Sequence, residues 1–232
     1  MDRFGPYAKA LRALEDDNRL RGLNPRAGID FSSNDYLAVA NASRMKRAAL
    51  AADERGTPLW FRRFAAFARQ LRGARLPRGR RRSVLRHRDS AVLPSCYVAN
   101  FTIPTTLPQR GDLLVLVSPV HASIHEGARA GRAEFRMAGH NDPGAIESAI
   151  RDWRRHGGMG RIWIVVKSLY SMDGDFAPLR EFVALADRFD ASLVVDEAHA
   201  TGVYGAQGRG LSSITIAARI SWLCIPAARR SE

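Results

Sequence analysis

The sequence predicts an α/β fold in which a mostly parallel sheet is flanked by helices. Three continuous apolar runs of strand length support this class, at residues 113–117, 161–166 and 192–195. Helical patterns separate the runs, and buried strands that alternate with helices form parallel sheets covered on both faces. The chain has 232 residues, which is long enough to bury a sizeable core.

Two regions are expected along the chain. Residues 1–50 are predicted to form an N-terminal helix and an extended segment, and residues 51–232 an incomplete large domain. Apolar residues recur at helical spacing over residues 8–20, which predicts an amphipathic helix. Residues 31–37 follow as a short strand or an extended turn.

Helices and turns are predicted around the three strands. A helix over residues 97–107 is weakened by Pro104, since proline lacks the backbone N–H that a helix interior uses. Asp142 and Pro143 suit the N-cap and the first turn of a helix that ends at Arg155. The remaining elements are a small-residue helix, a turn-rich segment and an amphipathic helix, at residues 126–132, 171–178 and 179–189.

The positive charge is concentrated in one stretch. The formal net charge is +13, and residues 55–88 hold 12 arginines with no lysine and no acid. Such a block has three interpretations: an arm that binds nucleic acid through its phosphates, a solvated segment, or an out-of-frame translation of a GC-rich gene. The third is favoured, so residues 55–90 are treated as anomalous and nucleic acid is not the expected partner.

Membrane and secretory classes are not expected. The sequence contains no apolar run of 18 residues or more, so a transmembrane helix is not predicted. Residues 1–20 are charged throughout and lack the apolar core of a signal peptide. The two cysteines, Cys96 and Cys224, fit a reducing compartment, which predicts a cytoplasmic protein.

Polar residues follow the predicted strands and suggest a site there. Asp196 comes directly after a buried strand, so its carboxylate needs a cationic or protonated partner unless it caps a turn. His199 lies three residues on, and His121 follows another strand. Ligands of open α/β sheets bind outside the carboxyl ends of the strands. No metal-binding motif and no glycine-rich phosphate loop is found, so these residues alone predict an α/β enzyme with a strand-end site and no metal.

Five ordered motifs resemble the α-oxoamine synthase family, which are pyridoxal-phosphate enzymes of the aspartate-aminotransferase fold (fold type I). The resemblance covers about residues 1–54 and 91–211. The motifs are Phe31-Ser-Ser-Asn-Asp-Tyr-Leu37, Tyr97-Val-Ala-Asn100, Val120-His-Ala-Ser123, Ser171-Met-Asp-Gly-Asp-Phe-Ala-Pro178 and Val195-Asp-Glu-Ala-His-Ala-Thr-Gly202.

The resemblance implies catalytic and cofactor-binding roles for three residues. Asp196 would pair with the protonated pyridine nitrogen of pyridoxal phosphate, which keeps the ring an electron sink. His199 would hydrogen-bond the phenolic oxygen of the ring. His121 would stack on the face of the ring.

Further contacts are implied by the same resemblance. Cys96 and Tyr97 would lie beside the cofactor phosphate and the ring edge, and Ser171 would add a polar contact. Arg21 and His121 would bind substrate.

The family reaction is a decarboxylative condensation of an amino acid with an acyl thioester. The motifs are nearest to the branch of biotin biosynthesis that uses L-alanine and pimeloyl-CoA or a pimeloyl carrier protein, and whose members are homodimers. Two alternatives within the family are glycine C-acetyltransferase and 5-aminolevulinate synthase. An alternative from another class is an arginine-rich nucleic-acid-binding protein on a disabled enzyme scaffold.

The sequence departs from the family in ways that predict an inactive chain. Its lysines are Lys9, Lys46 and Lys167, so none follows Asp196, where the family has its Schiff-base lysine. Lys167 replaces a family acid and ends a different strand, so little specific reaction with the cofactor is expected there. Cys96 replaces a family glycine.

The tail suggests a cause for the missing lysine. Residues 220–232, back-translated with suitable synonymous codons and read in another frame, contain Val-His-Thr-Cys-Gly-Lys, which resembles the family's lysine segment. Residues 212–232 are therefore predicted to be out of frame, and the C-terminal small domain of the family is expected to be missing.

Overall fold

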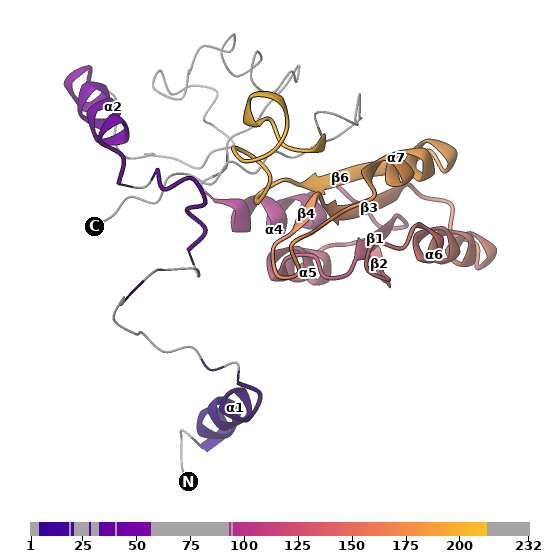
Figure 1. The fold of residues 1–232 in the computed structure, drawn as a ribbon. Helices are drawn as coiled ribbons and strands as arrows, with labels where there is room; N and C mark the ends of the chain where they lie inside the picture. Colours follow the sequence, from indigo (N-terminus) through magenta and orange to yellow (C-terminus); the bar gives the residue numbers. More distant parts are fainter. Residues whose placement is uncertain are drawn as a thin grey trace. The chain divides into compact units, whose positions relative to one another are not determined.

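The structure is a computed structural model that describes residues 5–18, 20, 28, 33–39, 41–56, 93 and 95–212. It contains two compact units, residues 1–34 and 35–232, and each is considered by itself. Figure 1 shows the order of the elements along the chain. The anomalous blocks at 55–90 and 212–232 lie almost entirely outside the described residues, so their interpretation stays a prediction.

The first unit contains the predicted N-terminal helix. Helix α1 spans Gly5–Asp16, so it begins three residues before the predicted start and ends four residues before the predicted end. Tyr7, Leu11 and Leu14 on this helix are all exposed.

Residues 33–56 form a turn and a second helix. The described part of the predicted strand or turn is a turn, in which the backbone N–H of Val39 donates to Asp35 Oδ1 at 2.9 Å. Helix α2 spans Ser43–Glu54 and buries no residue. It was not predicted from apolar periodicity because it has no buried face, and its alanines and charged residues favour a helix through intrinsic propensity instead.

A four-stranded parallel sheet forms the centre of the second unit, and it confirms the predicted fold class. The strand order is β2-β1-β3-β6, and all three pairings are parallel. The strands are β1 (Leu113–Val117), β2 (Glu134–Ala138), β3 (Ile162–Lys167) and β6 (Ser192–Asp196). Every carboxyl end therefore lies at the same edge of the sheet.

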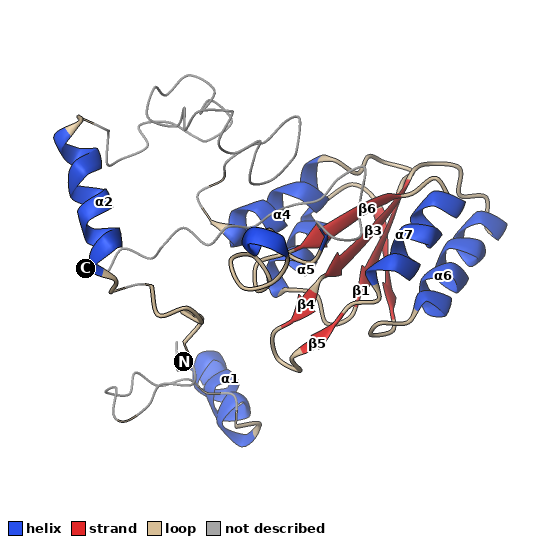
Figure 2. Cartoon of the chain, turned by 45° about the horizontal axis from the view of Figure 1, so that its top comes forward, coloured by secondary structure: helices blue, strands red, loops and turns tan. Residues whose placement is uncertain are grey.

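Helices cover both faces of this sheet, as Figure 2 shows. One face packs on α6 (Pro143–Arg155) and α7 (Leu179–Arg188) through Ile146, Ile150 and Phe182. The other face packs on α4 (Cys96–Thr106) and α5 (Ala122–Ala130) through Ile103, Ile124 and Ala128. Alternate residues of each strand serve the two faces, which is why the strands read as continuous apolar runs.

Two helix starts follow from capping groups. Asp142 caps α6 by accepting from the N–H of Ala145 at 3.0 Å, and Pro143 occupies the first turn, as predicted. Helix α5 begins four residues before the predicted start because the His121 ring serves as its N-cap and accepts from the N–H of Ser123.

Helices α4 and α5 pack closely, which fixes the position of α4 over the sheet. A Cβ atom on Gly127 would lie 2.5 Å from the carbonyl oxygen of Phe101, so a glycine is required at this crossing. The hydroxyl of Thr105 also donates to the carbonyl of Gly127 at 3.1 Å. Pro104 is accommodated within α4 and is buried.

The turn-rich segment forms a small antiparallel hairpin at the carboxyl edge. Its strands are β4 (Leu169–Tyr170) and β5 (Asp175–Phe176). The residues between them form a tight turn in which Gly174 has a φ of +75°.

A buried carboxylate anchors the loop that follows β6. Glu197 is fully buried and accepts from the hydroxyl of Ser168 and from the backbone N–H groups of Leu211 and Ser212. The loop contains the short 3-10 helix η2 (Ala206–Gly208). Gly210 has a φ of +85°, and a Cβ there would lie 2.6 Å from Glu197 Oε2.

None of the described helices is both long and apolar enough to cross a membrane.

Replacing Gly210 with Ala is expected to destabilise the fold more than replacing Gly174 with Ala. Both glycines have a positive φ, so each change costs about 1–2 kcal/mol of backbone strain. Only the Gly210 change also displaces the Glu197 carboxylate, which adds about 1–3 kcal/mol for poorly satisfied buried groups. Urea unfolding followed by far-UV circular dichroism measures both costs, and equal losses would contradict the anchoring role of Glu197.

Candidate active site

The predicted polar clusters meet at the carboxyl edge of the sheet. Asp196 ends β6 and is paired in register with Lys167, which ends β3. His199 lies near enough to both of these residues and to His121 for their charges to change its pKa. Side chains from three separate strand ends therefore lie near one another at this edge.

Asp196 is buried and held by two hydrogen bonds. It is 5% exposed, Oδ1 accepts from the N–H of Ala198, and Oδ2 accepts from the Asn100 side-chain amide, each at 2.9 Å. Asn100 is itself buried on α4. Asn100 belongs to one of the sequence motifs, but the sequence does not indicate this role, since its contact with Asp196 spans 96 residues.

His199 is partly buried and is held by a tyrosine that lies 163 residues away in the sequence. The hydroxyl of Tyr36 lies 2.8 Å from His199 Nδ1. Burial lowers the pKa of His199, the positive charge of Lys167 and the His121 ring lower it further, and Asp196 opposes them. The ring is therefore neutral at neutral pH, with one nitrogen as donor and the other as acceptor.

His121 has both a structural and a candidate catalytic position. Its Nδ1 lies 2.6 Å from the Ser123 hydroxyl and accepts from the N–H of Ser123, which caps α5. The imidazole is nevertheless exposed, and its centroid lies 6.4 Å from that of Tyr97 in an edge-on arrangement. The ring can therefore contact a ligand while it caps the helix.

Lys167 ends β3 beside Asp196, and the expectation of little specific reaction with the cofactor there stays a prediction. It is 5% exposed, and Nζ donates to the hydroxyl of Ser171 at 3.4 Å. Burial lowers the pKa of Lys167, although Asp196 and Asp173 partly oppose this effect. The sequence could not reveal the register that sets Lys167 against Asp196.

The structure describes all but one of the remaining predicted site residues. Tyr97 and Cys96 begin α4 after the N-cap Ser95, and Ser171 is exposed in the hairpin. Arg21 lies outside the described residues.

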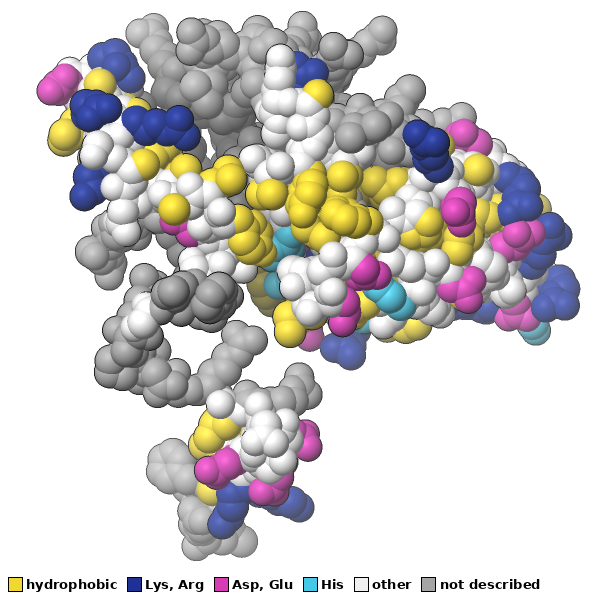
Figure 3. All heavy atoms as spheres, viewed as in Figure 1, with side chains coloured by type: hydrophobic (Ala, Val, Ile, Leu, Met, Phe, Trp, Pro, Cys, Tyr) yellow, Lys and Arg dark blue, Asp and Glu magenta, His cyan; other side chains and the backbone are white. Residues whose placement is uncertain are grey.

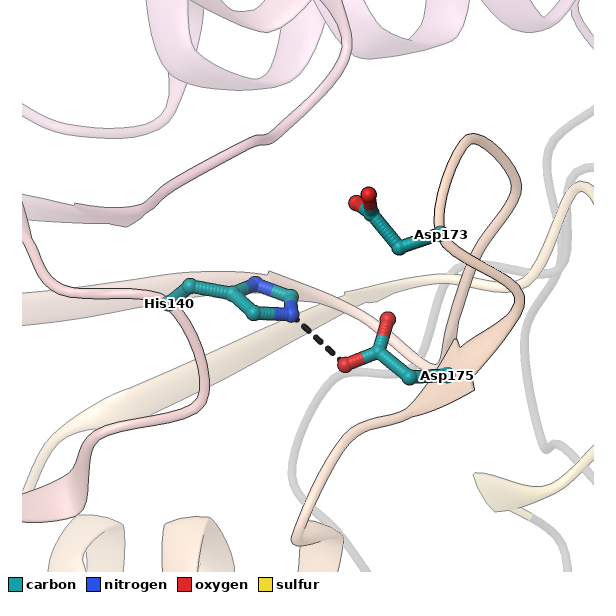
Figure 4. A group of neighbouring side chains, drawn as sticks. All are labelled: His140, Asp173 and Asp175. Atoms are coloured by element: carbon teal, nitrogen blue, oxygen red, sulfur yellow. Dashed lines mark hydrogen bonds and ion pairs between the residues drawn. The ribbon is translucent and has the colours of Figure 1, made fainter.

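A histidine and two acids gather beside the hairpin (Figure 4). His140, Asp173 and Asp175 place potential ligand atoms within 4.8 Å of one another. His140 Nε2 is already 2.6 Å from Asp175 Oδ2, and Nδ1 is 2.8 Å from the carbonyl oxygen of Ser118. This cluster ties the hairpin to the segment after β1 and so helps to fix Ser171.

A concavity of about 640 Å³ lies at the opposite edge, near the amino ends of the strands. It is lined by Arg110, Trp153 and Met159 among others. Ligands of open α/β sheets bind at the carboxyl ends, and this concavity contains none of the clustered site residues.

Hydrophobic side chains are exposed around the carboxyl edge. Met172, Phe176 and Tyr204 are 86%, 50% and 38% exposed, and Tyr97 is 52% exposed. Figure 3 shows hydrophobic side chains gathered beside histidines on one face.

The chain matches one protein family over most of its length. The model of the aminotransferase class I and II family matches residues 26–225.

The curated relatives that match the chain include proteins named 8-amino-7-oxononanoate synthase and serine palmitoyltransferase. The 8-amino-7-oxononanoate synthase of Geobacter sulfurreducens is 41% identical over 218 residues, which cover 88% of this chain and 54% of that protein. The enzyme of the same name from Emericella nidulans is 35% identical over 225 residues, or 88% and 53% of the two chains. Serine palmitoyltransferase of Caulobacter vibrioides is 43% identical over 125 residues, or 54% and 30% of the two chains. The chain spans about half the length of the first two relatives.

Solved structures of proteins with the same two names are also similar to this chain. Serine palmitoyltransferase of Sphingomonas wittichii has a TM-score of 0.68 at 26% identity and covers 91% of this chain and 56% of its own. The 8-amino-7-oxononanoate synthase of Francisella tularensis has a TM-score of 0.58 at 25% identity, with coverages of 83% and 51%.

The His140–Asp175 pair is expected to stabilise the fold more at pH 6 than at pH 8.5. Burial lowers the pKa of His140, but the hydrogen bonds to Asp175 and Ser118 outweigh it and raise this pKa above 6.5 overall. The stabilisation is therefore complete below pH 6.5 and is lost as the pH rises through the folded-state pKa. Urea unfolding of the unchanged chain and of His140→Gln at both pH values tests this, and Asp175→Asn is expected to remove the same pH dependence. A stability difference independent of pH would contradict the prediction.

Proposed function

The chain belongs to the aminotransferase class I and II family, and from this we propose that its sheet is the cofactor-binding part of an acyltransferase like 8-amino-7-oxononanoate synthase. The cofactor of this family is pyridoxal phosphate, and a serine palmitoyltransferase structure that matches the chain contains it. The observation that carries the proposal is the buried Asp196 carboxylate at the end of β6.

The residues around Asp196 fit a protonated pyridine nitrogen. Asn100 and the N–H of Ala198 each donate to one carboxylate oxygen, which orients the group and favours its ionised form. Each carboxylate oxygen has a second lone pair, so a cationic N–H can still be accepted. A buried acid is stable only with such donors, and a ring N–H⁺ completes the set.

The two histidines fit the ring itself. His199 is neutral and is oriented by Tyr36, so it can hydrogen-bond the phenolic oxygen without adding a charge. His121 is held through Ser123 and presents an exposed ring that can stack on a planar ligand. Both are proposed as catalytic and cofactor-binding residues together with Asp196.

The start of α4 fits the cofactor phosphate. Cys96 and Tyr97 lie in the first turn of this helix, and helix N-termini favour phosphate through their N–H groups and dipole. Ser171 supplies a hydroxyl from the hairpin. The bound cofactor would act as the electron sink that stabilises negative charge on the substrate carbon.

The proposed substrates are L-alanine and pimeloyl-CoA or a pimeloyl carrier protein, condensed with loss of carbon dioxide in biotin biosynthesis. The relatives named 8-amino-7-oxononanoate synthase, which match 88% of this chain, support this choice. His121 and Arg21 are proposed to bind substrate. We also propose a cytoplasmic homodimer, supported by the exposed hydrophobic residues at the carboxyl edge, and no nucleic-acid partner.

A second candidate is a serine palmitoyltransferase-like condensation of serine with a palmitoyl thioester. It is favoured by the 43% identity to the Caulobacter vibrioides enzyme, but that match covers only 54% of the chain. Because the chain itself is predicted to be inactive, activity with the two substrate pairs distinguishes the candidates only in a chain whose reading frame is restored across residues 55–90 and after Leu211.

Replacing Asp196 with Asn is expected to weaken the binding of pyridoxal phosphate by about 10- to 100-fold. The change removes a charge-assisted hydrogen bond to the ring nitrogen, which is worth about 1.5–3 kcal/mol. Equilibrium dialysis of the chain with pyridoxal phosphate measures the dissociation constant. Asp187→Asn, at an exposed position of α7, is the matched control and should bind like the unchanged chain. No cofactor binding by the unchanged chain would refute the proposed function.

A chain whose reading frame is restored across residues 55–90 and after Leu211 is expected to condense L-alanine with pimeloyl-CoA. In that chain, Asp196→Asn should lower kcat far more than a substitution of Arg21, which should mainly raise KM. The carboxylate acts in the charge-developing steps, whereas Arg21 would contribute uniform binding of the thioester. Steady-state kinetics with each substrate pair tests this, and a preference for glycine and acetyl-CoA would overturn the biotin assignment.

A further inference from the structure

We propose that Lys167 is a reactive amine that captures aldehydes at the carboxyl edge of the sheet, and that it forms an imine with pyridoxal phosphate. The identity of the aldehyde rests on the proposed function, whereas the reactivity of the lysine rests on its own surroundings. The chain has two other lysines, Lys9 and Lys46, and both are exposed on helices.

Lys167 lies where the ligand of the site would lie. It is the last residue of β3 and is paired in register with Asp196. Trp163 and Val165 pack against the α4 and α5 face, so the alternation along β3 places Lys167 on that same face. The Asn100 side chain approaches Asp196 from α4 on this face as well.

The amine is buried without a close carboxylate. Lys167 is 5% exposed, and among the described residues no carboxylate oxygen lies within 4.0 Å of Nζ. Its hydrogen bond is to the neutral Ser171 hydroxyl at 3.4 Å, and the Tyr170 ring centroid lies 5.9 Å away. A structural buried lysine normally has an ion-pair partner, so these surroundings favour a neutral amine.

The lowered pKa of Lys167 also favours a neutral amine. Burial lowers the pKa of Lys167, and the nearby Asp196 and Asp173 only partly oppose it. For each unit by which this pKa is lowered, the neutral fraction at a given pH below it rises about tenfold. Desolvated lysines of this kind are the ones that form Schiff bases with carbonyl compounds.

The chemical step balances without an oxidant or a reductant. The lone pair of neutral Nζ attacks the aldehyde carbon, and a proton passes from nitrogen to the former carbonyl oxygen. The resulting carbinolamine loses water, so that a C=N bond replaces the C=O bond. Exposed Ser171 lies beside Nζ, so the amine can be reached from the hairpin side of the site.

The experiment maps the modified lysine in the full chain. The chain is mixed with pyridoxal phosphate at pH 7.5, reduced with borohydride, digested, and analysed by mass spectrometry. We expect Lys167 to carry several-fold more label than Lys9 or Lys46. This excess should shrink as the pH of the reaction approaches the pKa of an ordinary lysine, about 10.4. Equal labelling of the three lysines, or labelling without Lys167, overturns the inference.

Substitutions of Lys167 test whether the label depends on its amine or only on a positive charge at this position. Lys167→Arg and Lys167→Met should both lose the site label, whereas Lys46→Arg should keep it. Loss of label in Lys46→Arg would contradict the assignment. The mapping in the unchanged chain does not depend on whether either Lys167 variant folds.

The same experiment distinguishes the inference from the proposed function. Cofactor retained in dialysis without label on Lys167 overturns the inference and leaves the proposed function intact. Label on Lys167 that is unaffected by Asp196→Asn supports the reactive amine but contradicts the proposed cofactor site.

Discussion

The parallel pairing of β3 with β6 is the constraint on which the rest of the site depends. Its register sets Lys167 against Asp196, a basic and an acidic side chain that are both buried at the end of the sheet. Neither is tolerated alone, because an unpaired buried charge costs several kcal/mol, roughly. The structure meets this cost with neutral donors and acceptors: Asn100 for the acid and Ser171 for the base. The edge therefore has an oriented carboxylate and a buried amine, and both can still interact with a ligand.

The core of the fold was predictable from local patterns. The limits of β1 match the prediction because a fully buried parallel strand reads as an unbroken apolar run. Helix α6 was predictable from Asp142 and proline at its start. Strand β2 was missed because much of its length is exposed, so that its sequence lacks a continuous apolar run. The start of α5 was missed because histidine is not among the residues that usually cap helices.

The site was predictable only in part. Asp196 and His199 stand out because a polar residue directly after a buried strand requires an explanation. Their partners could not be inferred, since Asn100 and Tyr36 lie 96 and 163 residues away from them in the sequence. The pairing of Lys167 with Asp196 could not be inferred for a related reason, because register between strands is not encoded in either strand alone.

The anchoring of the loop after β6 by Glu197 has a consequence for hydrogen exchange. The carboxylate joins Ser168, at the end of β3, to the N–H groups of Leu211 and Ser212. If the loop opened by itself, a fully buried carboxylate would lose two of its three donors. The loop and the sheet edge should therefore open as one cooperative unit. The amides of Leu211 and Ser212 would then exchange with solvent as slowly as those of the central strands, although they lie in a loop.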